Sequence, residues 1–511
     1  MNWRLRSIIP FLILLAVFSV QWLLLFSLRA PTWDAVSYYV YARSAVFDHD
    51  LEFANDYQLS YPTAGEDFAS KELDQIQTVT GYVQNIFAVG TSVLWLPWLA
   101  LLRLAAVFNW APGVASTAMT GYEPFFVANI SMLSVLFGFL AYLISYLVTE
   151  SVTSRMIALA ATITLMFATP LLYYQFREPM YSHTASAMVV ALVVLFWWRQ
   201  LQAEQFGFWQ GLVLGALIGL AGLVRWQNLA YLALPAVSIT MWWFSLPRDE
   251  RNHTWLEVAV YLLLVAAGAL LAFALQMIVW RVLYGSFITI PQGSGFMDWR
   301  APYLNPLLFS TFRGLLPWMP VFFLSLVGLL ALSRRSPQLA WPLLIMLLLV
   351  IYINGSTRDW FAGGGYGPRR LTSELVLLVV GYAGFLQLVP CHLRSWIATF
   401  LGVLLGSHQW LLLRYGLAES LGGRVLSMNP TFEWEDEALS TFLTDLLRLA
   451  NESAQDPLQA LVFPGSPLDV FLRLREPSWE HLTVLIMTSL FVILLFVVAL
   501  LVQQSAASRS H

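Results

Sequence analysis

Long apolar runs separated by short polar segments are the dominant pattern along the chain. The first run extends from Ile8 to Leu28 and follows Arg4 and Arg6. About 20 apolar residues suffice for a helix to cross the hydrocarbon core of a membrane, and this run is too long for the core of a signal peptide. It therefore predicts a retained membrane helix with a cytoplasmic N-terminus.

Further runs reach or approach the length of a membrane span. They lie near Phe125–Leu147, Met156–Tyr173, Thr184–Trp198, Trp209–Val224, Leu229–Phe244, Leu256–Val279, Leu315–Leu332, Ala340–Ile353, Leu371–Val389, Trp396–Leu413 and Val484–Val502. With the first run, they predict an all-α integral membrane protein with about 12 transmembrane helices and both termini in the cytoplasm.

The apolar stretch from Asn85 to about Phe108 stands apart from these spans. If it crossed the membrane, the short loops that carry Arg155, Arg199 and Arg394 would face away from the cytoplasm, against the positive-inside rule. We therefore predict that residues 86–108 form a juxtamembrane segment. The first extracytoplasmic loop is then large, covers residues 29–85 and carries further juxtamembrane helices.

This topology divides the chain into three parts. Residues 1–413 form a transmembrane domain whose unusual polar motifs lie at its extracytoplasmic end. Residues 414–481 are polar, with an amphipathic patch around ALSTFLTDLLRLA, and predict an extracytoplasmic helical segment. Residues 482–511 supply the last transmembrane helix and a cytoplasmic tail.

Composition excludes several classes of protein. Of the 511 residues, 59% are hydrophobic and 11% are charged, which is more apolar surface than a water-soluble domain needs. The net charge of −3 argues against nucleic acid as a partner. Cys391 is the only cysteine, so the chain has neither a disulfide framework nor a cysteine metal cluster.

Asp34 is the first candidate for chemistry. It follows the first apolar run within a few residues, and Tyr38 and Ala42 continue the same stripe of a helix expected to lie along the membrane surface. One interpretation is that Asp34 caps the N-terminus of that helix, which aspartate does well. The other is that it is a catalytic base facing a cleft accessible from the lipid.

A metal site in the first outer loop is an open alternative. Asp48-His49-Asp50 has the Asp-x-Asp spacing that holds a divalent cation in some sugar-nucleotide enzymes. So short a match arises readily by chance, and most acids of this loop are expected to be solvated.

Two polar tips join apolar runs on the predicted outer side. The tip FREPMYSH places Glu178 and His183 where one helix leaves the membrane and the next re-enters it. These residues are either ordinary interfacial polarity or part of a polar site opposite Asp34. Arg225, in LVRWQN, lies on an outward tip where an arginine is costly to keep without a partner.

The segment FAGGGYGPRR is the most specific local signal. Its glycines let the backbone approach a ligand closely, and Arg369 and Arg370 follow at the start of a predicted helix, where free amides favour an anion. The alternative is a tight turn followed by interfacial arginines. Arginines at the outer end of a helix run against the positive-inside bias, which favours an anion site.

The order of these motifs resembles that of the GT-C class of polytopic glycosyltransferases, the group of the protein mannosyltransferases and the lipid A aminoarabinose transferases. The resemblance rests on Asp34, GTSVLWLPW, EPMYSH, WRVLYGS and WFAGGGYGPRR, and it covers roughly residues 1–380. It implies a bundle of membrane helices with a large first outer loop, and a donor sugar carried on a polyprenyl phosphate. The acid of the family's first loop corresponds to Asp34.

From this resemblance we expect a glycosyltransferase in a bacterial cytoplasmic (inner) membrane, with its active site on the extracytoplasmic side. The partners would be a polyprenyl-phosphate sugar and a glycan, lipid or protein acceptor, and no cofactor or metal is required. The expected catalytic residues are Asp34 and Glu178, and the expected substrate-binding residues are Tyr38, His183, Arg225, Arg369 and Arg370.

A transporter or flippase of lipid-linked glycans is the alternative from another class. Transporters place ionisable groups or broken helices near the middle of the membrane. The predicted spans here are nearly free of charge, and the charges gather at the outer tips, which favours an enzyme.

Overall fold

The computed structural model describes residues 3–60, 77–421, 436–455 and 461–469, and within them the regular secondary structure is helical, apart from two isolated β-bridges. This confirms the predicted all-α class for the described part of the chain. In chain order the elements are α1 (Trp3–Leu25), α2 (Asp34–Arg43), a π-helix η1 (Ser44–Asp48), α3 (Ala54–Ser60), α5 (Gly90–Val107), α6 (Pro124–Glu150), α7 (Arg155–Ala168), α8 (Leu171–Phe176), α9 (His183–Gln202), α10 (Phe208–Val224), a 3₁₀-helix η2 (Trp226–Leu232), α11 (Ala233–Ser245), α12 (Arg248–Tyr284), α13 (Leu304–Phe309), α14 (Leu315–Trp318), α15 (Val321–Leu332), α16 (Pro337–Gly355), a 3₁₀-helix η3 (Arg369–Glu374), α17 (Leu375–Leu388), α18 (Cys391–Leu421) and α19 (Asp436–Gln455).

Eight described helices are long and apolar enough to cross a membrane, and three shorter apolar helices accompany them. The chain is therefore a multi-pass membrane protein. The predicted number of about 12 spans stays a prediction, and the span predicted near Val484–Val502 lies outside the described residues.

Two predicted spans are interrupted by proline. The run Met156–Tyr173 divides into α7 and α8 at Pro170, and the run Leu315–Leu332 divides into α14 and α15 at Pro320. Proline has no backbone N–H to donate and disfavours helical backbone in the residue before it, so a helix stops there. Hydrophobicity alone did not predict these breaks.

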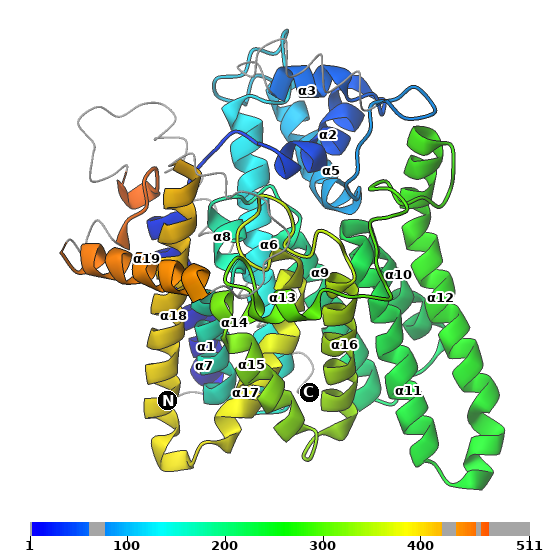
Figure 1. Ribbon diagram of the computed structural model, residues 1–511. Coiled ribbons are helices and arrows are strands. Elements are labelled where there is room, and N and C mark those ends of the chain that lie inside the picture. Colours follow the sequence, from blue (N-terminus) through cyan, green and yellow to red (C-terminus); the bar gives the residue numbers. More distant parts are fainter. Residues whose placement is uncertain (1–2, 61–76, 422–435, 456–460, 470–511) are drawn as a thin grey trace.

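The helix α5 lies beside α2 at one end of the molecule (Figure 1). By length and composition it belongs to the eight possible spans, although we predicted a juxtamembrane segment there. Its first residue, Gly90, packs on the last turn of α10, where an added Cβ would lie 2.3 Å from the carbonyl carbon of Leu223. This contact fixes α5 against the end of α10 that carries Arg225.

Small residues bring α10 and α12 into close contact. A Cβ on Gly215 would lie 2.1 Å from the carbonyl oxygen of Val265, and one on Gly268 would lie 2.3 Å from that of Leu212. Such close backbone approach is the usual means by which helices associate where lipid removes the hydrophobic driving force.

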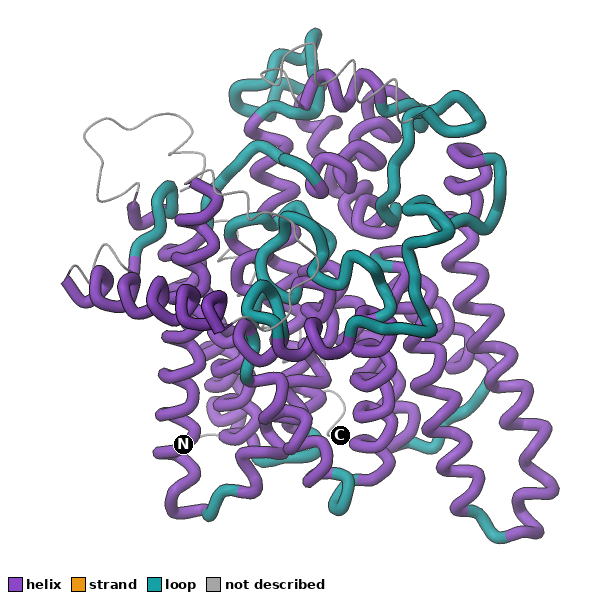
Figure 2. Tube along the Cα trace, in the orientation of Figure 1, coloured by secondary structure: helices purple, strands orange, loops and turns teal. Residues whose placement is uncertain are grey.

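The loop 285–303, called the strap below, is tied to two distant parts of the chain. At one end two side chains join the strap to the end of the first outer loop. Gln84 donates to the Pro291 carbonyl oxygen at 2.9 Å, and Gln292 donates to the Ile86 carbonyl oxygen at 3.2 Å. At the other end the backbone of Met297 and Thr357 forms a bridge. Figure 2 shows the strap and the loop after α16 among the teal segments beside the helix ends.

The C-terminal described segment returns to the first helix. The backbone N–H of Phe463 donates to the carbonyl oxygen of Leu24 at 3.0 Å, and the buried Arg177 bridges the carbonyl oxygens of Leu25 and Pro464. The predicted boundary between residues 413 and 414 falls inside α18, which continues without interruption to Leu421.

Candidate functional site

A cavity of about 420 Å³ lies where the first outer loop, the end of α10, η3 and the strap meet. Its walls include six of the seven residues predicted to form the site, which come from four separate parts of the sequence: Asp34, Tyr38, His183, Arg225, Arg369 and Arg370. The structure therefore brings these six together.

Asp34 is the first residue of α2, and its carboxylate is directed at Arg369. The Arg369 Nη1 atom lies 2.5 Å from the Asp34 Oδ2 atom, and the two side chains are 14% and 21% exposed. The N-cap position belongs to Trp33, which makes no capping hydrogen bond and has a φ of 50°. Positive φ is uncommon outside glycine and concentrates at functional sites. The Asp34 carboxylate thus pairs across the cavity, which the capping interpretation did not predict.

The glycines of FAGGGYGPRR make room for the Arg369 side chain. A Cβ on Gly365 would lie 2.4 Å from Arg369 Cδ and Nε, whereas a Cβ on Gly364 would meet nothing within 4 Å. Gly363 and Gly367 have φ values of 58° and 56°, which glycine adopts without strain. This turn therefore lays the guanidinium of Arg369 across the loop toward Asp34.

Arg370 is held by a different acid. Its Nη2 atom lies 3.0 Å from Asp359 Oδ2, and its Nη1 donates to Thr357 Oγ1 at 2.6 Å and to the Asp359 carbonyl oxygen. The guanidinium also lies over the Phe296 ring of the strap, 5.6 Å from its centre. Arg370 thus ties the glycine-rich turn to the strap, in addition to lining the cavity.

Arg225 lies where α10 ends and η2 begins, and among the described residues it has no carboxylate within ion-pair distance. Its Nη1 lies 2.8 Å from His183 Nδ1, and the same nitrogen of His183 lies 2.9 Å from Thr372 Oγ1. Burial lowers the pKa of Arg225, although arginine stays charged in proteins. Of the three arginines in the cavity wall, Arg225 is therefore the one without an ion pair to a described carboxylate.

Tyr38 completes the wall beside Asp34. Its hydroxyl accepts a hydrogen bond from Ser182 at 2.9 Å, and its ring packs edge-on against Phe87 with a centroid distance of 5.0 Å. Burial raises the pKa of Tyr38, so the hydroxyl stays protonated and able to donate to a ligand.

Glu178 does not line the cavity. It follows the buried Arg177, and its carboxylate pairs with Arg29 at 3.6 Å. Burial raises the pKa of Glu178, and the nearby Arg29 opposes that change. Of the two candidates in this tip, His183 thus lines the cavity, whereas the Glu178 carboxylate lies beside Arg29 in the segment that follows α1.

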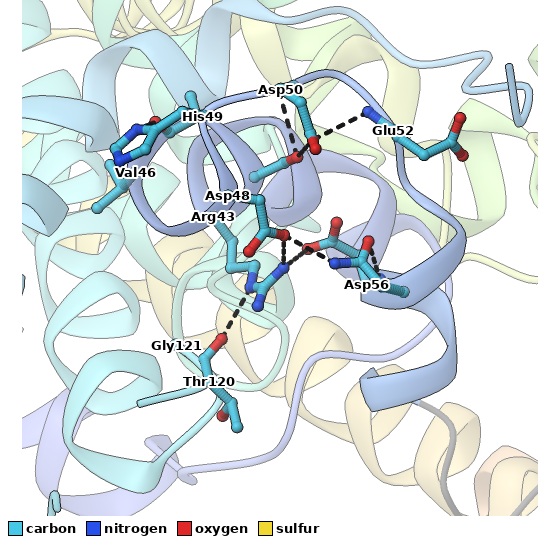
Figure 3. A network of polar contacts seen from close by, with 12 residues as sticks. Arg43, Val46, Asp48, His49, Asp50, Glu52, Asp56, Thr120 and Gly121 are labelled. Atoms are coloured by element: carbon cyan, nitrogen blue, oxygen red, sulfur yellow. Dashed lines mark hydrogen bonds and ion pairs between the residues drawn. The ribbon is translucent and has the colours of Figure 1, made fainter. Parts of the chain in front are cut away.

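The Asp-x-Asp acids of the first loop take part in local hydrogen bonds (Figure 3). Asp48 accepts from Arg43 and from Asn55, and Asp50 accepts from Ser44 at 2.7 Å. Arg43 also lies 3.2 Å from Asp56, a fully buried carboxylate. Burial raises the pKa of Asp56 to about 7, against the opposing effect of Arg43. Among the described residues, no group of three or more possible metal-binding His, Cys, Asp or Glu side chains occurs.

Several residues of the cavity wall were not predicted. They are Trp226 and Gln227 from η2, Gln292, Phe296 and Trp299 from the strap, and Asn354 from α16. The only available sequence signal was local: QGSGFMDW is a polar, glycine-containing loop between apolar runs, and WQN directly follows Arg225.

No protein-family model and no curated protein matches the chain. Among solved structures, it is similar to ArnT from Cupriavidus metallidurans bound to undecaprenyl phosphate, with 15% identity, a TM-score of 0.47, and coverage of 92% of this chain and 75% of that one. It is also similar to the oligosaccharyltransferase AglB from Archaeoglobus fulgidus in complex with an inhibitory peptide and a dolichol-phosphate. That match has 14% identity and a TM-score of 0.45, and covers 89% of this chain and 56% of that one. At these values neither similarity fixes the family or the activity of this chain.

Proposed function

We propose that the protein is a glycosyltransferase that moves a sugar from a polyprenyl-phosphate donor to an acceptor hydroxyl or amide. The observation that carries this proposal is the cavity whose wall holds both a carboxylate, Asp34, and the guanidinium of Arg225, which makes no ion pair with a described residue. The ligand class is the same as that of the undecaprenyl phosphate and the dolichol-phosphate held in the two solved structures named above.

The arginines suit the lipid phosphate. Arg225 has no described carboxylate within ion-pair distance, and Arg369 offers the guanidinium edge that Asp34 leaves free. Charge-assisted hydrogen bonds to phosphate are about twice as strong as neutral ones, and they strengthen as the leaving phosphate gains charge. Both arginines lie at the end of apolar helices, where the phosphate of a membrane-anchored lipid would lie.

Asp34 suits the role of general base. The acceptor would lose its proton to the Asp34 carboxylate as its oxygen or nitrogen forms a bond to the anomeric carbon. The bond between that carbon and the phosphate oxygen breaks, and the electron pair leaves with the polyprenyl phosphate. The ion pair with Arg369 holds the Asp34 carboxylate in place before the acceptor arrives.

The test of this function is transfer by purified protein in detergent or nanodiscs. A panel of radiolabelled polyprenyl-phosphate sugars is incubated with the protein, and release of free polyprenyl phosphate is measured together with labelled product. Cleavage that depends on Asp34 supports the proposal. Movement of intact donor across a vesicle membrane without cleavage would instead favour the transporter alternative.

We also propose that the cavity faces the extracytoplasmic side of a bacterial inner membrane. Arg199 lies exposed at the end of α9 opposite His183, and Gly364 is exposed on the loop beside the cavity. In a variant whose exposed Cys391 is replaced by alanine, a cysteine at position 364 should react with a membrane-impermeant thiol reagent in intact cells, and one at position 199 should not. The reverse labelling would invert this topology.

A further inference from the structure

The ionisable side chains that line the cavity carry an excess of positive charge. They are one carboxylate, Asp34, three guanidinium groups, the phenol of Tyr38 and the imidazole of His183, and with Tyr38 and His183 neutral the net charge is three minus one, or +2. The carboxylate is already engaged by Arg369, and Asp359 and Glu178 are not part of the cavity wall. Within the described part of the chain, the cavity wall therefore holds no carboxylate besides Asp34 that could pair with an ammonium group.

Three side-chain amides in the wall have their orientations fixed by the backbone. Gln227 Nε2 donates to the Arg370 carbonyl oxygen at 2.8 Å, Gln292 Nε2 donates to that of Ile86 at 3.2 Å, and Asn354 Nδ2 donates to that of Val350 at 2.8 Å. Because a backbone carbonyl oxygen can only accept a hydrogen bond, the NH₂ group of each amide must point toward it. The side-chain oxygen of each amide is then free to accept a hydrogen bond from a ligand. Among the described residues, none of these three oxygens accepts a hydrogen bond.

These amides come from three different elements around one cavity: η2, the strap and the end of α16. Free carbonyl oxygens are partners for hydroxyl groups, each of which has one proton to donate. Trp226 and Trp299 lie in the same wall and offer apolar ring surface to the C–H groups of a sugar ring. The wall therefore combines hydroxyl acceptors, aromatic surface and cations.

We infer that the sugar accepted in this cavity is polyhydroxylated and carries no positive charge, and that amino sugars are rejected. This inference rests on the proposed function and names the substrate class of that site. An ammonium group would need desolvation without a carboxylate in return, in a wall that already holds three cations. A neutral sugar would place its phosphate by Arg225 and its hydroxyls by the amide oxygens.

The experiment compares donors that share one polyprenyl phosphate and differ in the sugar: a neutral hexose, an amino sugar and a uronic acid. Binding is measured on the wild-type protein by a method that needs no turnover, and release of polyprenyl phosphate is measured separately. We expect the neutral donor to bind at least about tenfold more tightly than the amino sugar, which corresponds to about 1.4 kcal/mol.

A pair of matched variants tests where the discrimination arises. Gln292 and Gln84 both join the strap to the first loop, but only Gln292 lines the cavity. Gln292→Glu adds a carboxylate to the wall and should bring amino-sugar binding to within threefold of neutral-sugar binding. Gln84→Glu makes the same chemical change outside the wall and should leave the preference as in the wild type.

The inference is overturned if the wild type binds the amino sugar as tightly as the neutral sugar or the uronic acid, or if it binds no donor at all. It is also overturned if both glutamate variants change the preference equally. If the neutral donor is preferred but no donor is cleaved, the sugar class stands and only the proposed transfer reaction fails.

Discussion

Replacing Asp34 with asparagine should lower the rate of transfer and raise the affinity for polyprenyl phosphate. Asparagine keeps the size of the side chain and an amide oxygen for Arg369, but it cannot act as a base. General base catalysis typically contributes about 10²- to 10⁴-fold, so turnover should fall by that factor. The proposed leaving group should bind more tightly, because Arg369 loses the carboxylate that lies 2.5 Å away.

The size of the gain in binding follows from the ion pair. A hydrogen bond to a charged group contributes about 1.5–3 kcal/mol, and the lower value applies here because the two side chains are 14% and 21% exposed. About 1.5 kcal/mol corresponds to roughly tenfold tighter binding of polyprenyl phosphate. Titration calorimetry with polyprenyl phosphate and a transfer assay with the donor measure the two effects on the same preparation.

Asp359→Asn is the matched comparison for this variant. Asp359 holds Arg370 at 3.0 Å but does not line the cavity, so its loss should lower turnover far less than the loss of Asp34. Near-normal transfer by Asp34→Asn would exclude the role of base. Weaker binding of polyprenyl phosphate by the same folded variant would refute the competition between Asp34 and the lipid phosphate for Arg369.

Three further predictions concern single side chains. Arg225→Ala should weaken binding of polyprenyl phosphate by about 1.5–3 kcal/mol in a calorimetric titration, and unchanged affinity would remove it from the anion site. Gly365→Ala should lower both affinity and turnover because its Cβ would displace Arg369, whereas Gly364→Ala, with open space around it, should behave as wild type; equal loss in both would point to the loop backbone instead. The pKa of Asp56 in the folded protein is raised to about 7, so the protonated carboxyl favours the folded state. This contribution to stability is complete below pH about 4 and is lost as the pH rises to about 7. Asp56→Asn should remove up to about 1.4 kcal/mol per pH unit from the slope of unfolding free energy against pH, and an unchanged slope would contradict the raised pKa.

Helices were predicted well where a long apolar run had no proline. The run Phe125–Leu147 became α6, and the run Leu256–Val279 lies within α12, because burying a hydrocarbon-length segment in lipid requires every backbone group to bond within its own helix. The ends of α12 were missed by several residues, since polar residues extend the helix beyond its apolar part. At Pro170 the local backbone constraint prevailed over hydrophobicity.

Six of the seven residues predicted for the site line one cavity, but the sequence did not predict how they pair. Asp34 and Arg369 were each singled out by their position next to an apolar run, yet their ion pair joins positions 335 residues apart. Local patterns do not specify which helix ends meet. Glu178 and His183 are five residues apart in one tip, and the sequence predicted that both belong to the site. Only His183 lines the cavity, because Glu178 pairs with Arg29.

The separation of Asp34 from Arg369 has a consequence for biosynthesis. At roughly 5–20 residues per second, the ribosome needs about 17–67 s to make the intervening chain. During that time the first loop must keep its fold at the membrane surface without the Arg369 guanidinium, which later pairs with Asp34. Arg43 can serve the nascent loop during this interval, because its partners Asp48 and Asp56 lie within 13 residues of it. The loop thus has a cation of its own from the beginning, and the wall of the cavity is complete only when Arg369 and Arg370 have emerged.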